Sequence, residues 1–292
     1  MISVIVPARD AAATLGPCLA ALAEQDVEHE VIVVDDGSRD ATAAIARAAG
    51  VVVVAGSGRG PGAARDAGAA IARGEVLAFT DADCVPDAGW LRAGLAALEH
   101  ADLVQGRVEP ARPAGPYDRT VSVQRLSGLW EAANLLVRRD AFPGFVAGLS
   151  PRRGKELGED VLMGWRAVAG GARPAFAPRA VVRHAVFPRS PAAYVAERAR
   201  RRFFPELVRR APELRDAFLY RRCFLTARHA RLDLALAGLA LRRPALALPY
   251  LVAVERDRRA RGNGPAAVEV AADLVGAGAL VVGSVRAKTL VL

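Results

Sequence analysis

Cysteine is scarce in this chain of 292 residues, and a charged N-terminal leader is missing. Cys18, Cys84 and Cys223 lie far apart with no paired spacing, which argues against a disulfide framework or a thiolate zinc site. Met1 is followed directly by the apolar, β-branched residues 2–6, which are typical of a strand rather than a signal peptide. We therefore expect a protein of a reducing compartment, the cytoplasm.

Long uncharged runs are missing as well. The longest late runs are residues 234–241, 244–254 and 274–285, each shorter than the ~18–20 residues that a membrane-spanning helix needs. We therefore expect no transmembrane helix. Hydrophobic residues nevertheless make up 52% of the chain, which excludes a disordered or collagen-like protein and allows a large buried core.

Acidic residues are scarce only in the last third of the chain. The whole chain carries 40 Lys and Arg against 31 Asp and Glu, a formal net charge of +9. Residues 1–180 hold 19 basic and 22 acidic side chains, a net charge of −3, whereas residues 181–262 hold 19 and 7, a net charge of +12. The basic excess therefore belongs to the C-terminal part.

Short β-branched runs alternate with alanine-rich stretches through the first hundred residues. The expected strands are residues 2–6, 31–34, 51–54 and 76–79, and the expected helices are residues 11–24, 41–49, 63–72 and 88–98. The strands show no polar alternation, as expected when helices cover both faces of a sheet. The pattern predicts an α/β fold with a mostly parallel sheet, whose ligand-binding edge lies at the carboxyl ends of the strands.

A connection rich in proline and glycine, residues 109–116, marks a change in the second half of the chain. Beyond it we expect a strand at 134–137, a glycine-rich loop at 142–158, a helix at 159–169 and a strand at 181–184. From Pro191 onward the sequence predicts an arginine-rich helical segment.

Two acidic pairs follow expected strands at the ligand-binding edge. Asp35 and Asp36 end an apolar strand, and a binding role for at least one of them is favoured over helix capping, which Ser38 or Asp40 could supply. Asp81 and Asp83, two residues apart in an extended segment, could share a divalent cation that bridges a diphosphate. The alternative for the second pair is a turn with side-chain hydrogen bonds before a proline.

Two further features could contribute to chemistry. The glycine-rich residues 56–62 do not fit a dinucleotide-binding fingerprint, but Arg65 in the following helix could meet a phosphate or a carboxylate. The alternative for Arg65 is an ion pair with Asp66 or another loop acid. Glu159 and Asp160 open a helix, where carboxylates are favoured by the helix dipole alone, but either could serve as a base for a reacting hydroxyl.

These segments together resemble a known family. SVIVPARD at residues 3–10, VVDDGSRD at 33–40, GAARDAG at 62–68 with GEVLAFTDAD at 74–83, and GEDVLMGWR at 158–166 resemble, in order and spacing, the family 2 glycosyltransferases. The resemblance spans residues 2–185. It implies the GT-A fold, a Rossmann-like sheet with flanking helices, followed here by a helical, Arg-rich C-terminal extension.

The resemblance also implies an activity. A single sugar would pass with inversion from a nucleotide-diphosphate donor, usually UDP-linked, to an acceptor hydroxyl, with Mg²⁺ or Mn²⁺ bound. Residues 1–108 would form the nucleotide-sugar-binding half of the GT-A domain, residues 109–190 the acceptor-binding half, and residues 191–292 the basic helical extension. The Gln-x-x-Arg-Trp signature of processive synthases is missing, which favours transfer of one sugar.

Roles for individual residues follow from the same resemblance. Those expected to contact the donor are Pro7, Ala8, Arg9, Asp35, Asp36, Arg65 and Asp81. Asp83 would hold the metal, with His184 as a second candidate ligand or, alternatively, a structural histidine. Asp160 would deprotonate the acceptor, with Glu159 as its neighbour and second candidate. Asp10 and Asp66 stand where the family often has asparagine, so donor contacts in those loops are expected to differ.

Two other classes of function were considered as alternatives to a glycosyltransferase. A sugar-phosphate nucleotidyltransferase would need a glycine-rich basic loop after the first strand, which residues 7–14 lack. A non-catalytic nucleotide-sugar-binding or nucleic-acid-binding protein is the other rival, although no nucleic acid is expected as partner.

The favoured role of the basic extension is attachment to an anionic membrane surface at the inner face of the cell membrane. The alternative is a helical face that is merely solvated. The arginines on which this rests are Arg198, Arg200, Arg201, Arg202, Arg209, Arg210, Arg242 and Arg243. Such attachment would suit an acceptor that is lipid-linked or part of a cell-envelope glycan.

Overall fold

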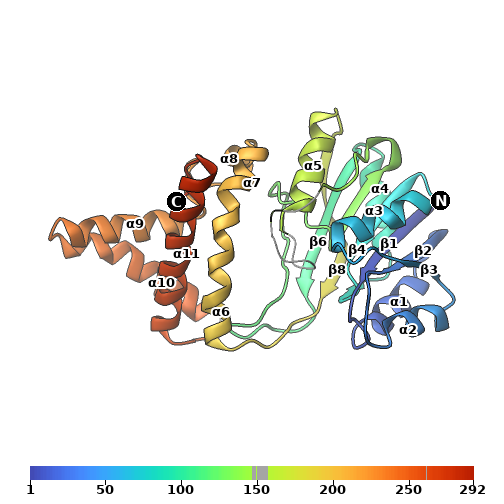
Figure 1. The fold of residues 1–292 in the computed structure, drawn as a ribbon, viewed down its shortest axis with the longest axis horizontal. Helices are drawn as coiled ribbons and strands as arrows, with labels where there is room; N and C mark the ends of the chain where they lie inside the picture. The colour runs from blue at the N-terminus through green and yellow to red at the C-terminus, as the bar shows by residue number, and fades with distance from the viewer. Residues whose placement is uncertain (147–148, 150–156, 261) are drawn as a thin grey trace. The chain divides into compact units, whose positions relative to one another are not determined.

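The computed structural model describes residues 1–146, 149, 157–260 and 262–292 (Figure 1). The predicted loop at 142–158 lies in large part outside these residues. Two compact units are present. The first comprises Met1–Arg112 and Thr120–Ala185, and the second comprises Pro113–Arg119 and Val186–Leu292.

The first unit is built on one sheet of eight strands. Its strands are β1 (Ile2–Ala8), β2 (His29–Asp35), β3 (Val52–Ala55), β4 (Val76–Thr80), β5 (Cys84–Pro86), β6 (Leu103–Pro110), β7 (Asn134–Arg138) and β8 (Pro174–His184). Its helices are α1 (Leu15–Ala23), α2 (Thr42–Ala48), α3 (Pro61–Ile71), α4 (Trp90–Leu98) and α5 (Glu159–Ala169), with the short turn η1 (Arg139–Ala141). The strand order is β3-β2-β1-β4-β7-β6-β8-β5.

Six of these strands run in one direction, and β7 and β5 oppose them. β1 pairs in parallel with β2 and β4, and β6 pairs in parallel with β8, whereas β7 is antiparallel to both β4 and β6. The predicted α/β class and mostly parallel sheet are thus confirmed. β5 and β6 were not expected as strands from the sequence.

Helices cover both faces of the sheet, which explains the lack of polar alternation in β1. Val4 and Val6 pack with α1 and α4 in one cluster, while Ile5 packs with α3 and α5 in another. Gly68 of α3 lets this helix approach closely, because a Cβ there would lie 2.6 Å from Cγ2 of Ile5. Two cores therefore hold the sheet rigid beneath its loops.

The second unit is helical. Its elements are α6 (Pro191–Glu197), η2 (Arg198–Phe203), α7 (Phe204–Arg210), α8 (Leu214–Ala217), α9 (Ala227–Ala240), η3 (Pro244–Ala247), α10 (Leu248–Ala260) and α11 (Ala266–Ala287). Leu232, Tyr250 and Val254 form a small core between α9 and α10. Arg228 is buried there and pairs with Glu269 at 3.0 Å and Asp273 at 2.6 Å, two carboxylates of α11.

Two features of the C-terminal segment were not recognised in the sequence. α11 has 22 residues and a mean hydropathy of 1.7, so by length and composition it could cross a membrane, with 33% of that window buried. The sequence analysis did not recognise this helix because it counted only uncharged runs, and Asp273 interrupts the apolar pattern.

The arginines of η2 also differ from expectation. Arg198 lies over the ring of Tyr194 at 4.3 Å, and Arg201 contacts Nε2 of His229 at 2.6 Å. Arg209 and Arg210 are exposed but both pair with Glu206 of their own helix. These contacts involve four of the eight arginines on which the predicted membrane attachment rests, and that attachment stays a prediction.

Candidate active site

The predicted site residues of the first unit gather at one edge of the sheet. Parallel strands β1, β2 and β4 end there, and the register places Ala8 beside Asp35. β7 runs the opposite way, so it begins at this edge, with Asn134 opposite Thr80. β8 ends at the same side, where His184 pairs with Cys84 of β5. Carboxyl ends of parallel strands are where open α/β sheets bind ligands.

The loops after β1 and β2 are tied to each other. Pro7 and Ala8 are buried in β1, and Arg9 is exposed. Asp10 has a φ of 50°, and its Oδ1 accepts a 2.8 Å hydrogen bond from the Arg39 backbone N–H. Its own N–H donates to Oγ of Ser38 at 3.0 Å. This bracing makes the pocket expected for a nucleoside a rigid one.

Asp36 organises the glycine-rich loop. The side chain is 3% exposed, and its two oxygens accept hydrogen bonds from the Gly58 and Gly60 N–H groups at 2.8 and 2.9 Å. Gly56 is required beside it, because a Cβ there would lie 2.7 Å from Oδ1. Asp35 accepts from the Ser38 N–H at 3.0 Å. Both acids therefore shape the loops. Each carboxylate oxygen of Asp36 can accept more than one hydrogen bond, so a ligand donor could still bind to it.

Arg65 is the cation at the centre of the site. It is 4% exposed, and its Nη2 lies 2.6 Å from Oδ1 of Asp81 while its Nη1 lies 3.4 Å from Oε1 of Glu159. The ring of Phe145 lies 5.5 Å from its guanidinium carbon. Asp66 is not its partner, since Oδ1 of that residue accepts from the Phe145 N–H. Arg65 thus joins two acidic motifs that are far apart in the sequence.

Two carboxylates beside Arg65 have raised pKa values. Burial, and then the charges of Glu159 and Glu131, raise the pKa of Asp160 well above its ordinary value. Burial, and then Asp81 and Glu159, raise the pKa of Glu131 to about 7, against the opposing effect of Arg65. A carboxylate with such a pKa can hold or accept a proton near neutral pH, as general acid–base chemistry requires.

Glu131 was not expected from the sequence. It lies just before β7, whose antiparallel course brings the start of the strand to the edge where β4 ends. Trp130 before it has a φ of 53° and packs on Gly164 of α5, where a Cβ would lie 2.2 Å from Cγ of the indole. A bulky residue in this conformation is strained, so the packing against α5 fixes the position of Glu131.

Asp83, Cys84 and His184 are grouped so that one ligand atom of each lies within 4.8 Å of the others. Nε2 of His184 lies 3.5 Å from Oδ1 of Asp83. Its Nδ1 lies 2.6 Å from the Ala185 carbonyl, to which a proton on Nδ1 can be donated, so Nε2 is the nitrogen that faces Asp83. Burial, and then Asp81 and Asp83, raise the pKa of the Cys84 thiol well above its ordinary value, so it stays protonated. The oxygen and nitrogen donors fit Mg²⁺ or Mn²⁺.

The chain was compared with known proteins. The family model "Glycosyl transferase family 2" matches residues 3–154. Glycosyltransferase AglE of Haloferax volcanii is 33% identical over 160 residues, which cover 48% of this chain and 53% of AglE. The chain therefore spans about half the length of this curated relative.

Solved structures share the fold. Mannosyltransferase PcManGT of Pyrobaculum calidifontis, in complex with GDP-Man and Mn²⁺, matches with a TM-score of 0.57 and 21% identity, over 98% of this chain and 86% of that one. S. aureus TarS 1-349 in complex with UDP-GlcNAc matches with a TM-score of 0.52 and 21% identity, over 99% and 92%. By its sequence match and its GT-A fold, the chain belongs to glycosyl transferase family 2.

Proposed function

We propose that the protein transfers a single sugar from a nucleotide-diphosphate donor, a UDP-sugar in the first instance, to an acceptor hydroxyl with inversion at the anomeric carbon. The observation that carries the proposal is the meeting of Asp81 and Glu159 on the buried Arg65. This contact joins the loop expected to hold the donor to the helix expected to hold the base. Solved structures with the same fold are complexes with GDP-Man and Mn²⁺ and with UDP-GlcNAc, which supports a nucleotide-sugar donor.

Donor binding would use the braced loops at the sheet edge. The nucleoside would lie against Pro7, Ala8 and Arg9, with Asp36 accepting a hydrogen bond from the base and Asp35 beside it. Asp81 would face the ribose or the sugar while Arg65 keeps its carboxylate in place. Because these groups are already held by hydrogen bonds, little ordering is needed when the donor binds.

A divalent ion would be held by Asp83 and His184. The lone pair of Nε2 and the Asp83 carboxylate face one position, and the ion would add charge neutralisation for a departing diphosphate. The Ala185 carbonyl, 2.6 Å from Nδ1, orients the ring so that Nε2 would be the metal ligand. The metal requirement can be tested by titrating Mn²⁺ and Mg²⁺ into EDTA-treated protein.

Asp160 would act as the general base. Oδ1 accepts from the Val161 N–H at 2.8 Å, which orients the carboxylate at the start of α5. The acceptor proton would move to Asp160 as the acceptor oxygen attacks the anomeric carbon, and the bond from that carbon to the diphosphate oxygen breaks. The raised pKa makes this carboxylate a stronger base than an ordinary aspartate. Glu159, bound to Arg65, would serve as its neighbour and alternative.

The deciding experiment measures release of free nucleotide from UDP-, GDP- and dTDP-sugars with and without Mn²⁺. We expect Asp83→Asn to weaken metal-dependent nucleotide binding, and Asp160→Asn to abolish transfer while leaving that binding intact. Asp140→Asn, the same change at an exposed position, is the matched control. Anomeric configuration of the product, read by NMR, tests inversion. A fully active Asp160→Asn enzyme would refute the assignment of Asp160 as the general base.

We further propose that the acceptor is lipid-linked or a cell-envelope glycan, and that the protein works as a peripheral protein at the inner face of the cell membrane. The basic surplus of residues 181–262 and the exposed apolar side chains of the helical unit support this placement. Flotation of the purified protein with anionic vesicles at low and high salt tests it.

A further inference from the structure

The turn between α9 and α10, with the adjoining ends of both helices, carries a cluster of strongly exposed apolar side chains. Leu239, Leu241, Leu248, Leu251 and Val252 are each more than half exposed, with Leu241 at 68%. Figure 1 shows that α9 and α10 form a hairpin whose turn projects beyond α11 of the same unit. Isolated exposed leucines are common on proteins, but five on one hairpin end form a patch that needs a partner.

The charge pattern of the hairpin is one-sided. From Leu234 to Val254 the chain has no carboxylate, and its only charged residues are Arg242 and Arg243. Both arginines are exposed in the turn, and neither forms an ion pair with a described residue. This contrasts with Arg209 and Arg210, which both pair with Glu206.

The turn is built to present this surface. Gly238 lets the chain fold back on α9, because a Cβ there would lie 2.6 Å from Cβ of Leu246 and 2.9 Å from the Arg243 carbonyl oxygen. Arg242 has a φ of 57°, a left-handed conformation that ends α9. The exposed leucines are therefore held on a tight, packed turn rather than on a loose loop.

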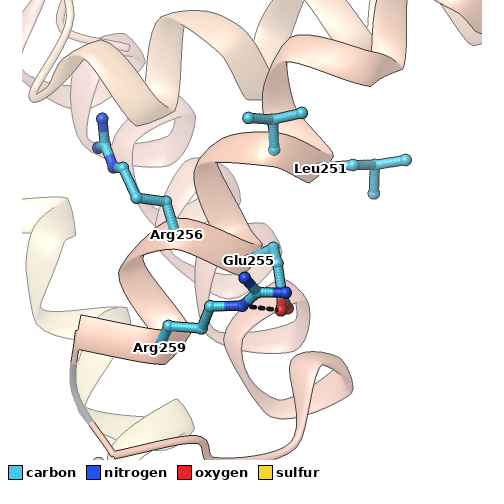
Figure 2. A pocket seen from close by; sticks show the side chains of 5 residues that line it. Leu251, Glu255, Arg256 and Arg259 are labelled. Atoms are coloured by element: carbon cyan, nitrogen blue, oxygen red, sulfur yellow. Dashed lines mark hydrogen bonds and ion pairs between the residues drawn. The ribbon is translucent and has the colours of Figure 1, made fainter.

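A hollow of about 520 Å³ on α10 extends the patch. It is lined by Leu251, Val252, Glu255, Arg256 and Arg259. Figure 2 shows Leu251 on one side of it and the Arg259–Glu255 pair on the other. Apolar side chains thus lie beside arginines on the same helix, although Arg256 and Arg259 are paired with Asp257 and Glu255, so the unpaired positive charge of the hairpin lies in its turn.

We propose that the α9–α10 turn is the membrane-docking surface of the protein, with its leucines in the interfacial layer of a bilayer and Arg242 and Arg243 on anionic headgroups. This deepens the peripheral membrane placement given under Proposed function and rests on it, but it does not rest on the transferase activity. The charge pattern favours lipid over a second copy of the chain. A symmetric pairing of two such turns would bring Arg242 and Arg243 of both copies together with no carboxylate of the hairpin between them.

The test is flotation of the purified full chain with vesicles of phosphatidylcholine alone or mixed with phosphatidylglycerol. Wild type is expected to bind the mixed vesicles, and less strongly at high salt. Leu241→Asn and Leu248→Asn should each lower the vesicle partition coefficient by about tenfold, because each removes a leucine side chain that would be buried among the lipids. The double variant Arg242→Gln/Arg243→Gln should have a partition coefficient on mixed vesicles that is lower by about fivefold for each arginine removed, while its binding to phosphatidylcholine vesicles should be unchanged.

Matched controls separate docking from folding. Leu290→Asn changes a leucine outside the hairpin that is 55% exposed, and Arg47→Gln changes an exposed arginine on α2, so neither should alter flotation. Thermal melts of all variants show whether the fold is kept. Nucleotide release in solution should be the same for every variant, so a failed transferase proposal would be seen in that assay and not in flotation.

Three results would overturn the inference. If wild type fails to float, the peripheral placement falls together with the docking surface. If wild type floats and the two leucine variants float equally well, another surface docks. If the leucine changes abolish self-association in sedimentation velocity while vesicle binding is absent, the turn is an interface between copies.

Discussion

Replacing Glu131 by glutamine tests the electrostatics of the site. Glu131 lies among the carboxylates of Asp81, Glu159 and Asp160, and burial, followed by the charges of Asp81 and Glu159, raises its pKa from 4.5 to about 7. The folded protein therefore binds this proton more tightly than the unfolded chain does. A rise from 4.5 to about 7 corresponds to about 3 kcal/mol of linkage free energy.

The sign of the effect follows from proton binding. Below about pH 4 the side chain is neutral in both states, so Glu131→Gln should change the free energy of unfolding little. As the pH rises through the folded pKa of about 7, wild type loses the stabilising proton and the uncharged glutamine does not. The variant should therefore become the more stable protein, by up to about 3 kcal/mol above neutral pH.

Urea denaturation in EDTA across this pH range measures the difference. Glu24→Gln, the same change at an exposed position, should show no such trend. The charge of Glu131 is also one of the causes that raise the pKa of Asp160, so the acid limb of the activity profile should move to lower pH in Glu131→Gln. A stability difference between wild type and variant that is independent of pH, or a variant less stable than wild type above neutral pH, would refute the reasoning.

Three other changes test the remaining contacts. Arg65→Met leaves the buried Glu159 and the half-buried Asp81 without their cation and should destabilise the protein by about 3–5 kcal/mol in urea at neutral pH, and by less in acid, where the carboxylates are protonated. Gly164→Ala places a Cβ 2.2 Å from the Trp130 ring and should cost about 1–3 kcal/mol in thermal melts, whereas Gly16→Ala has open space and should not. Asp36→Asn replaces one accepting oxygen by an amide NH2 group that faces a loop N–H, and it should lower the free energy of unfolding by about 1–3 kcal/mol. The same variant should bind UDP more weakly in calorimetry.

Local patterns in the sequence predicted the strands that carry the motifs. β1, β2 and β4 are runs of buried β-branched and apolar residues followed by acids, and such runs are recognisable without tertiary information. β6 was not recognised because Gln105, Gly106 and Arg107 interrupt its apolar pattern. β5 is only three residues long and contains Pro86, so it carries no signal of its own.

Contacts between distant segments could not be predicted from these patterns. Arg65 had two candidate partner types in the sequence, and only the fold shows that it pairs with Asp81 and Glu159 rather than Asp66. Glu131 has no motif around it, and its place in the site depends on the reversed direction of β7. The arginines of η2 looked free because their partners, such as His229, lie on another helix. Composition gives the net charge of a segment, but the partners of its charged side chains are set by the tertiary structure.

The site has an excess of negative charge that bears on how a donor could bind. Among the residues that the structure describes, Arg65 faces the carboxylates of Asp81, Glu131, Glu159 and Asp160. A diphosphate carries further negative charge, and in a partly buried site like charges repel strongly. The metal site proposed at Asp83 and His184 would therefore have a second role besides the proposed catalysis. A cation held there would offset the repulsion between the donor and the carboxylates proposed as bases, so metal binding and donor binding should be coupled.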